Sequence, residues 1–151
     1  MDNTNQQKEI INLLNQYLAN IAVITTNLYN FHWNIIGPNF ISMHKKLEEY
    51  YQEGLKMFDL TAERIKQLNG FPLTELKQYS ELAHLKNHPS KDYTEKEVIK
   101  NVLHDFNYLT AITKQIINYT ESTNDLVTTS ILSDFTSFLE KEQWMLNANL
   151  K

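Results

Sequence analysis

Cysteine is absent from this chain of 151 residues, and glycine and proline occur only three times each. Without cysteine there is no disulfide, no thiolate zinc site and no cysteine nucleophile, so a bound metal must take nitrogen and oxygen ligands. The absence also fits a reducing compartment, and we expect the protein to act in the cytoplasm. All three prolines and two of the three glycines lie within residues 37–38 and 70–89, which predicts two breaks in an otherwise helical chain.

Long apolar runs and an excess of positive charge are missing as well. No run of about 18 apolar residues occurs, so we expect no transmembrane helix, and the polar segment 1–9 lacks the apolar core of a secretory signal. The net charge is −4, which argues against tight binding of DNA phosphates by Lys and Arg. A hydrophobic content of 42% is typical of a globular chain, and we expect one domain over residues 1–151.

The first helix is indicated by apolar residues that alternate in steps of four and three from Ile10 to Phe31. Trp33 and Ile35 continue this seam until Gly37-Pro38 ends it. The break is short, so a second helix over residues 39–68 should turn back antiparallel. Its expected inward residues are Phe40, Leu47, Tyr51, Phe58, Ala62 and Ile65.

Gly54 lies inside the second helix, where a glycine costs about 1 kcal/mol against alanine. Either another backbone approaches closely at this point, such as a partner helix, or the glycine is a tolerated defect. Asn69-Gly70 then predicts the end of the helix.

Residues 70–93 form a long connection that includes a possible short helix over 73–85. Such a link can return the chain parallel to the second helix, as in an all-α, ferritin-like four-helix bundle with one long crossover. Thr94 and Glu97 form a capping box that opens the third helix. Its expected apolar stripe is Ile99, Leu103, Phe106, Leu109, Ile112, Ile116 and Tyr119.

A fourth helix follows a short break, with Thr123 or Asn124 as its cap and Asp125 in its first turn. Its expected inward residues are Val127, Ile131, Phe135, Phe138, Trp144 and Met145.

The candidate metal ligands are two histidines and three acids: His32, His44, Glu48, Asp59 and Glu63. His44 and Glu48 lie one helical turn apart, as do Asp59 and Glu63, so each pair shares a helix face. The two pairs are roughly 22 Å apart along one helix, too far for a single ion. An antiparallel second copy would bring one pair to the other and build the site twice across a two-fold axis. We therefore predict a metal site between subunits.

The motif that contains these ligands resembles the Dps family, the mini-ferritins. It comprises His32-Trp33-Asn34, Gly37-Pro38-Asn39-Phe40, His44 twelve residues after His32, and Asp59-x-x-x-Glu63-Arg64. The resemblance implies a four-helix subunit with a short helix in the crossover and assembly as a hollow dodecamer. It also implies a di-iron ferroxidase centre at the two-fold interface, with His32, His44 and Glu48 from one subunit and Asp59 and Glu63 from the other.

The family reaction oxidises Fe(II), preferentially with hydrogen peroxide, and stores ferric oxide in the cavity, so the resemblance implies iron as Fe2+ and Fe3+ and protection against oxidative damage. Fe(II) suits imidazole and carboxylate ligands with open positions for the oxidant. The resemblance also implies acidic pores, for which Glu121 and Asp125 are the matching residues. One position departs from the family: Glu48 stands where an Asp is usual, and its extra methylene shifts the carboxylate.

The plainer interpretation is a structural role for His84, His88 and His104, and the Glu81-x-x-His84 sequence occurs once only. Trp33 is expected to pack beside the metal site, and Arg64 to pair with a carboxylate. Two other functions stay open. One is a DNA-compacting protein, although the first ten residues set only Lys8 against Asp2 and Glu9. The other is a helical shell without ferroxidase activity.

Overall fold

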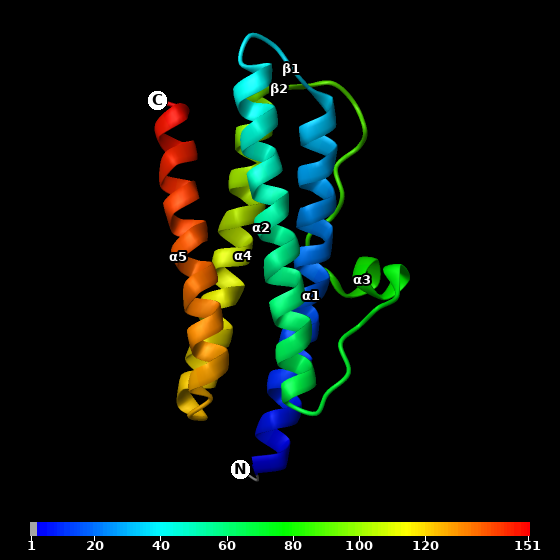
Figure 1. The fold of residues 1–151 in the computed structure, drawn as a ribbon, viewed down its shortest axis with the longest axis vertical. Helices are drawn as coiled ribbons and strands as arrows, with labels where there is room; N and C mark the ends of the chain where they lie inside the picture. Colours follow the sequence, from blue (N-terminus) through cyan, green and yellow to red (C-terminus); the bar gives the residue numbers. More distant parts are fainter. Residues whose placement is uncertain (1–2) are drawn as a thin grey trace.

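The computed structural model describes residues 3–151, in which five α-helices and two short β-strands occur. In chain order the elements are α1 Asn3–Asn34, β1 Ile35–Ile36, α2 Phe40–Gln67, α3 Leu76–Leu82, β2 Tyr93–Thr94, α4 Glu95–Ser122 and α5 Leu126–Asn149. Figure 1 shows α1, α2, α4 and α5 as a bundle, with α3 beside α1 on the outside. The prediction of an all-α, ferritin-like bundle with a short helix in the crossover is confirmed.

The crossover returns the chain to the end of the bundle at which α2 begins, so that α2 and α4 run parallel (Figure 1). There β1 pairs in parallel with β2, Ile35 opposite Tyr93 and Ile36 opposite Thr94. This two-residue pairing was not predicted, because Ile35 extended an apolar helical seam. It fixes the turn after α1 to the start of α4.

The seam of α1 forms the centre of the core as predicted. Its seven apolar residues are all buried: Ile10, Leu14, Tyr17, Ile21, Ile24, Leu28 and Phe31. Among the described residues, no helix combines the length and the apolar character needed to cross a bilayer. The expectation for the polar segment 1–9 includes Met1 and Asp2, which lie outside the described residues.

Asparagines on α1 hold the crossover against the bundle. The side-chain oxygen of Asn20 accepts from the backbone N–H groups of His84 and Leu85, both at 3.1 Å. The amide of Asn27 donates to the Lys86 carbonyl at 3.1 Å, and its oxygen accepts from the His88 N–H at 3.1 Å. These bonds replace the backbone partners that an irregular segment lacks. Because asparagine breaks an apolar pattern, the periodicity gave no sign of this role.

The inward faces of α2 and α5 differ from the predicted ones by one position at several points. On α2 the buried residues are Met43, Leu47, Tyr50, Gly54, Met57, Thr61 and Ile65. On α5 they are Thr128, Leu132, Phe135, Leu139, Glu142 and Leu146. The expected core residues Phe40, Val127, Trp144 and Met145 are exposed, and Trp33 is 69% exposed. The buried stripes include polar and small residues such as Gly54, Thr61 and Glu142. A prediction from hydrophobicity alone therefore selected the neighbouring face at these points.

The helix ends follow their predicted chemistry with one correction. The capping box of Thr94 and Glu97 is present at the start of α4. Asn69 has φ 60° and Asn124 has φ 57°, and each closes its helix in a left-handed conformation. Neither Thr123 nor Asn124 caps α5, because the Asp125 side chain accepts from the Thr128 N–H at 3.0 Å and is the N-cap itself.

Gly54 is a point of close approach, but the nearest atoms belong to a side chain of the same chain and not to another backbone. A β-carbon added at Gly54 would lie 2.6 Å from Oγ1 of Thr25 on α1. That hydroxyl oxygen is buried without a hydrogen-bond partner. The glycine therefore lets α2 lie close against α1 midway along its length.

Candidate metal centre

The turn between α1 and α2 brings His32 and His44 together. His32 lies in the last turn of α1 and is buried, and His44 is half-buried near the start of α2. Gly37 has φ 118°, a conformation that favours glycine, and its carbonyl accepts from the Phe40 N–H at 3.1 Å. The two imidazole rings stack with centroids 3.7 Å apart and 20° between their planes. The rings thus meet although twelve residues separate them.

Each histidine is oriented by the backbone of the other. Nδ1 of His32 lies 2.7 Å from the carbonyl oxygen of His44, and Nδ1 of His44 lies 2.8 Å from that of His32. A carbonyl oxygen only accepts hydrogen bonds, so each Nδ1 carries the proton and donates it. In the neutral form of each ring the lone pair then lies on Nε2, the nitrogen that can bind a metal. The chain itself fixes the tautomer and direction of both rings.

Aromatic side chains wall one side of this pair. Tyr51 packs edge-on against His32 with centroids 5.2 Å apart, and Tyr29 lies between Tyr51 and Trp33 at 4.6 and 5.5 Å. Burial, then the charge of Glu48, then Tyr29 raise the pKa of Tyr51 above its ordinary value. Tyr51 was expected in the core, and Tyr29 was not singled out, since both fall beside the apolar seams. Their position becomes evident only when α1 and α2 pack.

Glu48 follows His44 by one turn of α2 and is half-buried. The side-chain amide of Gln52 donates to Oε1 of Glu48 at 3.3 Å. The carboxylate thus lies on the helix face of His44 and keeps acceptor capacity for a cation. These three side chains form the histidine half-site: His32, His44 and Glu48.

Asp59 and Glu63, the acidic half-site, lie farther along α2 and are exposed. The structure does not bring them to the histidines within one chain. Over residues 3–151 no group of three or more His, Asp or Glu side chains is arranged to hold a metal. With the half-sites roughly 22 Å apart along α2, one subunit holds the predicted ligands as two separate, incomplete sets.

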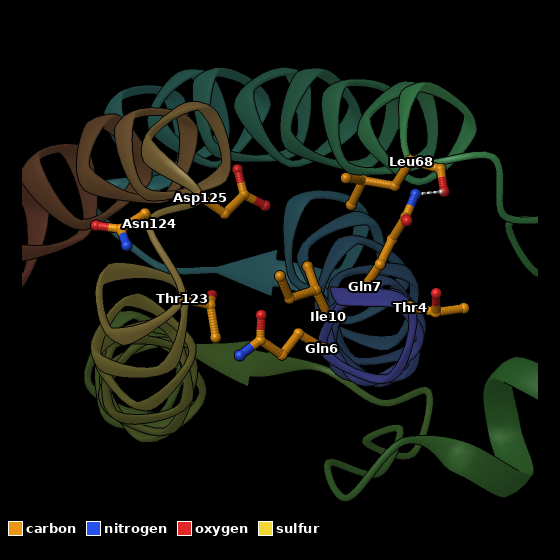
Figure 2. A pocket seen from close by; sticks show the side chains of 8 residues that line it. All are labelled: Thr4, Gln6, Gln7, Ile10, Leu68, Thr123, Asn124 and Asp125. Atoms are coloured by element: carbon orange, nitrogen blue, oxygen red, sulfur yellow. Dashed lines mark hydrogen bonds between the residues drawn. The ribbon is translucent and has the colours of Figure 1, made fainter. Parts of the chain in front are cut away.

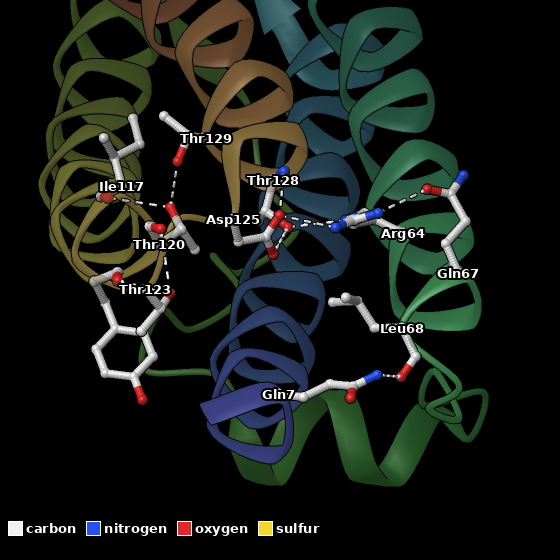
Figure 3. Close-up of polar contacts among 11 residues, drawn as sticks. Gln7, Arg64, Gln67, Leu68, Ile117, Thr120, Thr123, Asp125, Thr128 and Thr129 are labelled. Atoms are coloured by element: carbon white, nitrogen blue, oxygen red, sulfur yellow. Dashed lines mark hydrogen bonds and ion pairs between the residues drawn. The ribbon is translucent and has the colours of Figure 1, made fainter. Parts of the chain in front are cut away.

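The predicted pore residues lie at the opposite end of the bundle. Asp125 is half-buried, and its Oδ1 receives a bond from Nη2 of Arg64 at 2.8 Å, as Figure 3 shows. Arg64 Nε also donates to the Thr128 hydroxyl at 2.9 Å. Arg64 therefore pairs with a carboxylate, as expected. Glu121 is exposed at the end of α4, four residues before Asp125. The pore assignment stays a prediction.

A cavity of about 410 Å³ lies beside this junction (Figure 2). It is lined mainly by polar side chains from α1 and from the turn between α4 and α5, and the Gln7 amide donates to the Leu68 carbonyl at 2.6 Å. The ion pair with Arg64 and the bonds from Thr128 engage both carboxylate oxygens of Asp125. No side chain of the lining is left as an evident ligand.

The other histidines have protein neighbours other than the proposed ligands. The His84 ring stacks on Tyr108 at 4.7 Å, while His88 and His104 approach the buried Asp105 at 3.9 and 3.1 Å. Glu81 pairs with Lys77 at 3.6 Å on the surface. These contacts fit the structural interpretation.

Glu142 on α5 is a buried charge that was not predicted. Its Oε2 accepts from the Tyr50 hydroxyl at 3.0 Å and lies 3.1 Å from Nζ of Lys46. Burial lowers the pKa of Lys46, but hydrogen bonds to Glu49 and Glu142 outweigh burial and raise it overall. Burial, together with the charge of Glu142, raises the pKa of Tyr50. The apolar pattern of α5 gave no sign of this role, because the partners of Glu142 lie on α2.

Comparison with known proteins places the chain in a family. A family model described as "Ferritin-like domain" matches residues 11–151. The chain is 35% identical to "DNA protection during starvation protein" from Helicobacter pylori over 91% of this chain and 96% of that protein. The chain belongs to the Dps family of ferritin-like proteins.

Two solved Dps structures show the same fold. A Dps protein from Bacillus brevis is 34% identical, with a TM-score of 0.93, over 97% of this chain and 98% of that chain. The Dps protein from Vibrio cholerae O1 is 33% identical, with a TM-score of 0.95, over 98% and 92%. The latter is described as a member of a broad superfamily of ferritin-like diiron-carboxylate proteins. Membership supports iron storage and protection as the general function of this chain.

Proposed function

We propose that this protein is an iron-sequestering mini-ferritin that oxidises Fe(II) with hydrogen peroxide at centres shared between two subunits. In each centre His32, His44 and Glu48 of one subunit face Asp59 and Glu63 of the partner subunit. The ferric product is stored as mineral inside a hollow dodecamer in the cytoplasm. Removing Fe(II) and peroxide together protects the cell against oxidative damage.

The observation that carries this proposal is the reciprocal bonding of the two histidines. Both Nδ1 atoms donate to backbone carbonyls, at 2.7 and 2.8 Å, so the Nε2 atoms of the two stacked rings are the nitrogens available to a metal, and Glu48 follows His44 by one turn of α2. Metal-binding histidines commonly donate their second ring nitrogen in this way. A purely structural pair of stacked histidines would not require a carboxylate one turn away on the same face.

The ligand set suits iron that is oxidised and then released. Imidazole and carboxylate with open positions fit Fe(II), and carboxylates also bind the harder Fe(III). Two Fe(II) ions give one electron each to one hydrogen peroxide, whose O–O bond breaks. With two water molecules the products are two ferric oxyhydroxide units and four protons. Glu48, Asp59 and Glu63 supply negative charge that offsets the charge gained by iron.

Iron needs a route to the interior, and for this we propose the junction of α4 and α5. Glu121 is exposed there, whereas Arg64 holds Asp125. The acidic contribution to a pore would therefore come chiefly from Glu121, with Asp125 positioning the start of α5.

The test is anaerobic addition of Fe(II) followed by hydrogen peroxide, with ferric absorbance and assembly mass read together. The wild type should oxidise iron inside a large shell. His32→Gly/His44→Gly should stay assembled and oxidise iron about 10-fold more slowly or worse, since both nitrogen ligands are gone. His84→Gly is the matched control and should behave as wild type. Equal rates in wild type and the double variant would leave a shell without ferroxidase activity as the better account.

DNA compaction is the alternative function, because relatives carry the name "DNA protection during starvation protein". The net charge is −4, and the segment 3–10 contains one basic residue, Lys8, and one acidic residue, Glu9. Little positive charge is therefore available to neutralise phosphates. We predict that no DNA mobility shift persists above about 150 mM salt. A shift that survives such salt would establish DNA binding alongside the iron chemistry.

A further inference from the structure

The outward surface of α2 carries both half-sites in one line. His44, Glu48, Gln52, Leu55, Asp59 and Glu63 recur at steps of three and four and so share one side of the helix. The buried residues of α2, such as Leu47, Gly54 and Met57, lie on the other side. We call the six residues the open face of α2. No residue of this face other than His44 contacts α1 through a hydrogen bond among the described bonds.

Leu55 is the apolar member of the open face and is 47% exposed. A single exposed leucine is ordinary, but its location is informative. The point midway between the two half-sites falls between Glu53 and Gly54, about one and a half residues from Leu55. The apolar residue therefore lies at the centre of an otherwise polar face.

Symmetry gives that centre a meaning. A two-fold axis that exchanges the half-sites of two antiparallel copies must pass between the two α2 helices, level with the point midway between the half-sites. At about 1.5 Å of rise per residue, Leu55 lies roughly 2 Å along the helix from the level of the axis. The two copies of Leu55 are therefore offset by roughly 4–5 Å in the same direction. Its Cβ tilts toward the helix N-terminus and thus toward the axis. Two helices packed about 8–10 Å apart would bring these side chains into contact.

We propose that Leu55 packs against Leu55 of the partner subunit on the two-fold axis, and that this contact sets the register of the two metal centres. The inference rests on the proposed function, since the axis is located from the shared ligands. The partner is a second copy of this chain.

Charge explains why an apolar contact is needed at this point. Glu48, Asp59 and Glu63 take part in none of the ion pairs of the described residues, so the two open faces would bring six unpaired carboxylates together. Like charges repel at close range, so the carboxylates oppose the approach of the two faces until iron binds between them. Burial of apolar surface is independent of charge, so the leucines hold the faces in place while both centres are empty.

The cysteine-free chain allows a direct test by mild oxidation of single-cysteine variants. A disulfide requires Cα atoms about 4.4–6.8 Å apart. Leu55→Cys in the assembled protein should give a covalent dimer on a non-reducing gel. Lys56→Cys, one residue along on another side of α2, and Ile41→Cys, on the open side but roughly 37 Å from its own copy, should not.

Two outcomes overturn the inference: Leu55→Cys that stays monomeric on the gel, or Ile41→Cys that cross-links instead. The result is separable from the proposed function. If the wild type oxidises iron but Leu55→Cys does not cross-link, the leucine contact is wrong and the ferroxidase proposal stands. If Leu55→Cys cross-links but the wild type does not oxidise iron, the leucine contact stands and the ferroxidase proposal is wrong.

A second variant tests the apolar contact itself. Leu55→Arg should shift the assembly toward smaller species on size exclusion and slow iron oxidation per chain, while Leu55→Met should match the wild type. Full assembly of Leu55→Arg would show that the leucine pair does not hold the interface.

Discussion

The two half-sites of α2 differ in how much of each one subunit prepares. At the start of the helix His32 and His44 are stacked, bonded through their Nδ1 atoms to backbone carbonyls and walled by Tyr51. Farther along, Asp59 and Glu63 are exposed and have no ion pair among the described residues. One half is ordered by its own chain, whereas in the proposed centre the other half is completed by a partner subunit.

This difference indicates which of the predicted ligands need a fixed orientation. Imidazole binds a metal through one lone pair in the ring plane, so its direction must be fixed in advance. A carboxylate can bind through either oxygen and adjusts by rotation, so we predict that Asp59 and Glu63 need no supporting shell to bind iron. In the proposed centre, an exposed carboxylate would also let ferric product leave.

The largest effect is expected from combining variants that each lack one half-site. His32→Gly/His44→Gly and Asp59→Asn/Glu63→Gln should each lose peroxide-dependent iron oxidation. Co-assembly in equal amounts should restore about one quarter of the wild-type centres, since half of the dimers are mixed and each has one intact site. Rates of ferric absorbance measure this. A mixture that stays as inactive as its components would mean that each centre lies within one subunit.

The support of the acidic half can be weakened through its neighbour Arg64. Arg64→Gln should lower the free energy of unfolding by about 1–3 kcal/mol, because Asp125 and Thr128 lose their charged partner. Chemical denaturation of matched assemblies measures it. Lys77→Gln removes the exposed pair with Glu81 and should change stability little. An equal effect of both substitutions would contradict the distinction between half-buried and exposed pairs.

The middle of α2 can be tested at Gly54. Gly54→Ala should lower the free energy of unfolding by about 1–2 kcal/mol. The added Cβ would lie 2.6 Å from Oγ1 of Thr25, and this clash should outweigh the gain in helix propensity. Thr25→Ala/Gly54→Ala should recover stability, because the hydroxyl is removed and has no partner to lose. Thermal unfolding of the four proteins forms a double-mutant cycle. If the two changes prove additive, Thr25 is not the obstacle.

The smallest effect is a pH dependence beside the histidine half-site, where β2 leads into α4. Lys91, then the N–H and hydroxyl of Thr94, lower the pKa of Glu97 from 4.5 to about 2. A lowered folded-state pKa contributes stability above pH 4.5 that is lost as the pH falls toward 2. The difference in melting temperature between wild type and Glu97→Gln should therefore shrink over that range. NMR titration of Lys91→Gln should return the Glu97 midpoint toward 4.5.

Local patterns predicted most of the fold. The alternation of four and three on α1, the capping box at Thr94 and the end of α2 before Asn69-Gly70 were all confirmed because they depend on near neighbours along the chain. The predicted inward faces of α2 and α5 were wrong in part, because Gly54, Thr61 and Glu142 are buried through contacts with other helices. Propensity cannot anticipate a buried glutamate whose partners Tyr50 and Lys46 come from another helix.

The candidate site divides in the same way. Residue types and spacing selected His32, His44, Glu48, Asp59 and Glu63, and arithmetic along one helix predicted that they need two chains. The mutual Nδ1 bonds and the wall of Tyr29 and Tyr51 could not be read from spacing, since they depend on the turn at Gly37 and on the packing of α1 against α2. The roles of the five ligands, the dodecamer and the cytoplasmic location stay predictions.

The sequence by itself determined the helices, their ends and the order of potential ligands, because helical periodicity and capping act over a few residues. Tertiary structure decided which face each helix buries, how asparagines hold the crossover, and which ring nitrogen of each histidine bonds to a backbone carbonyl. These outcomes depend on groups far apart in the chain that meet only when the backbone has packed. Hydrogen-bond direction and burial are properties of that packing and not of any single stretch of residues.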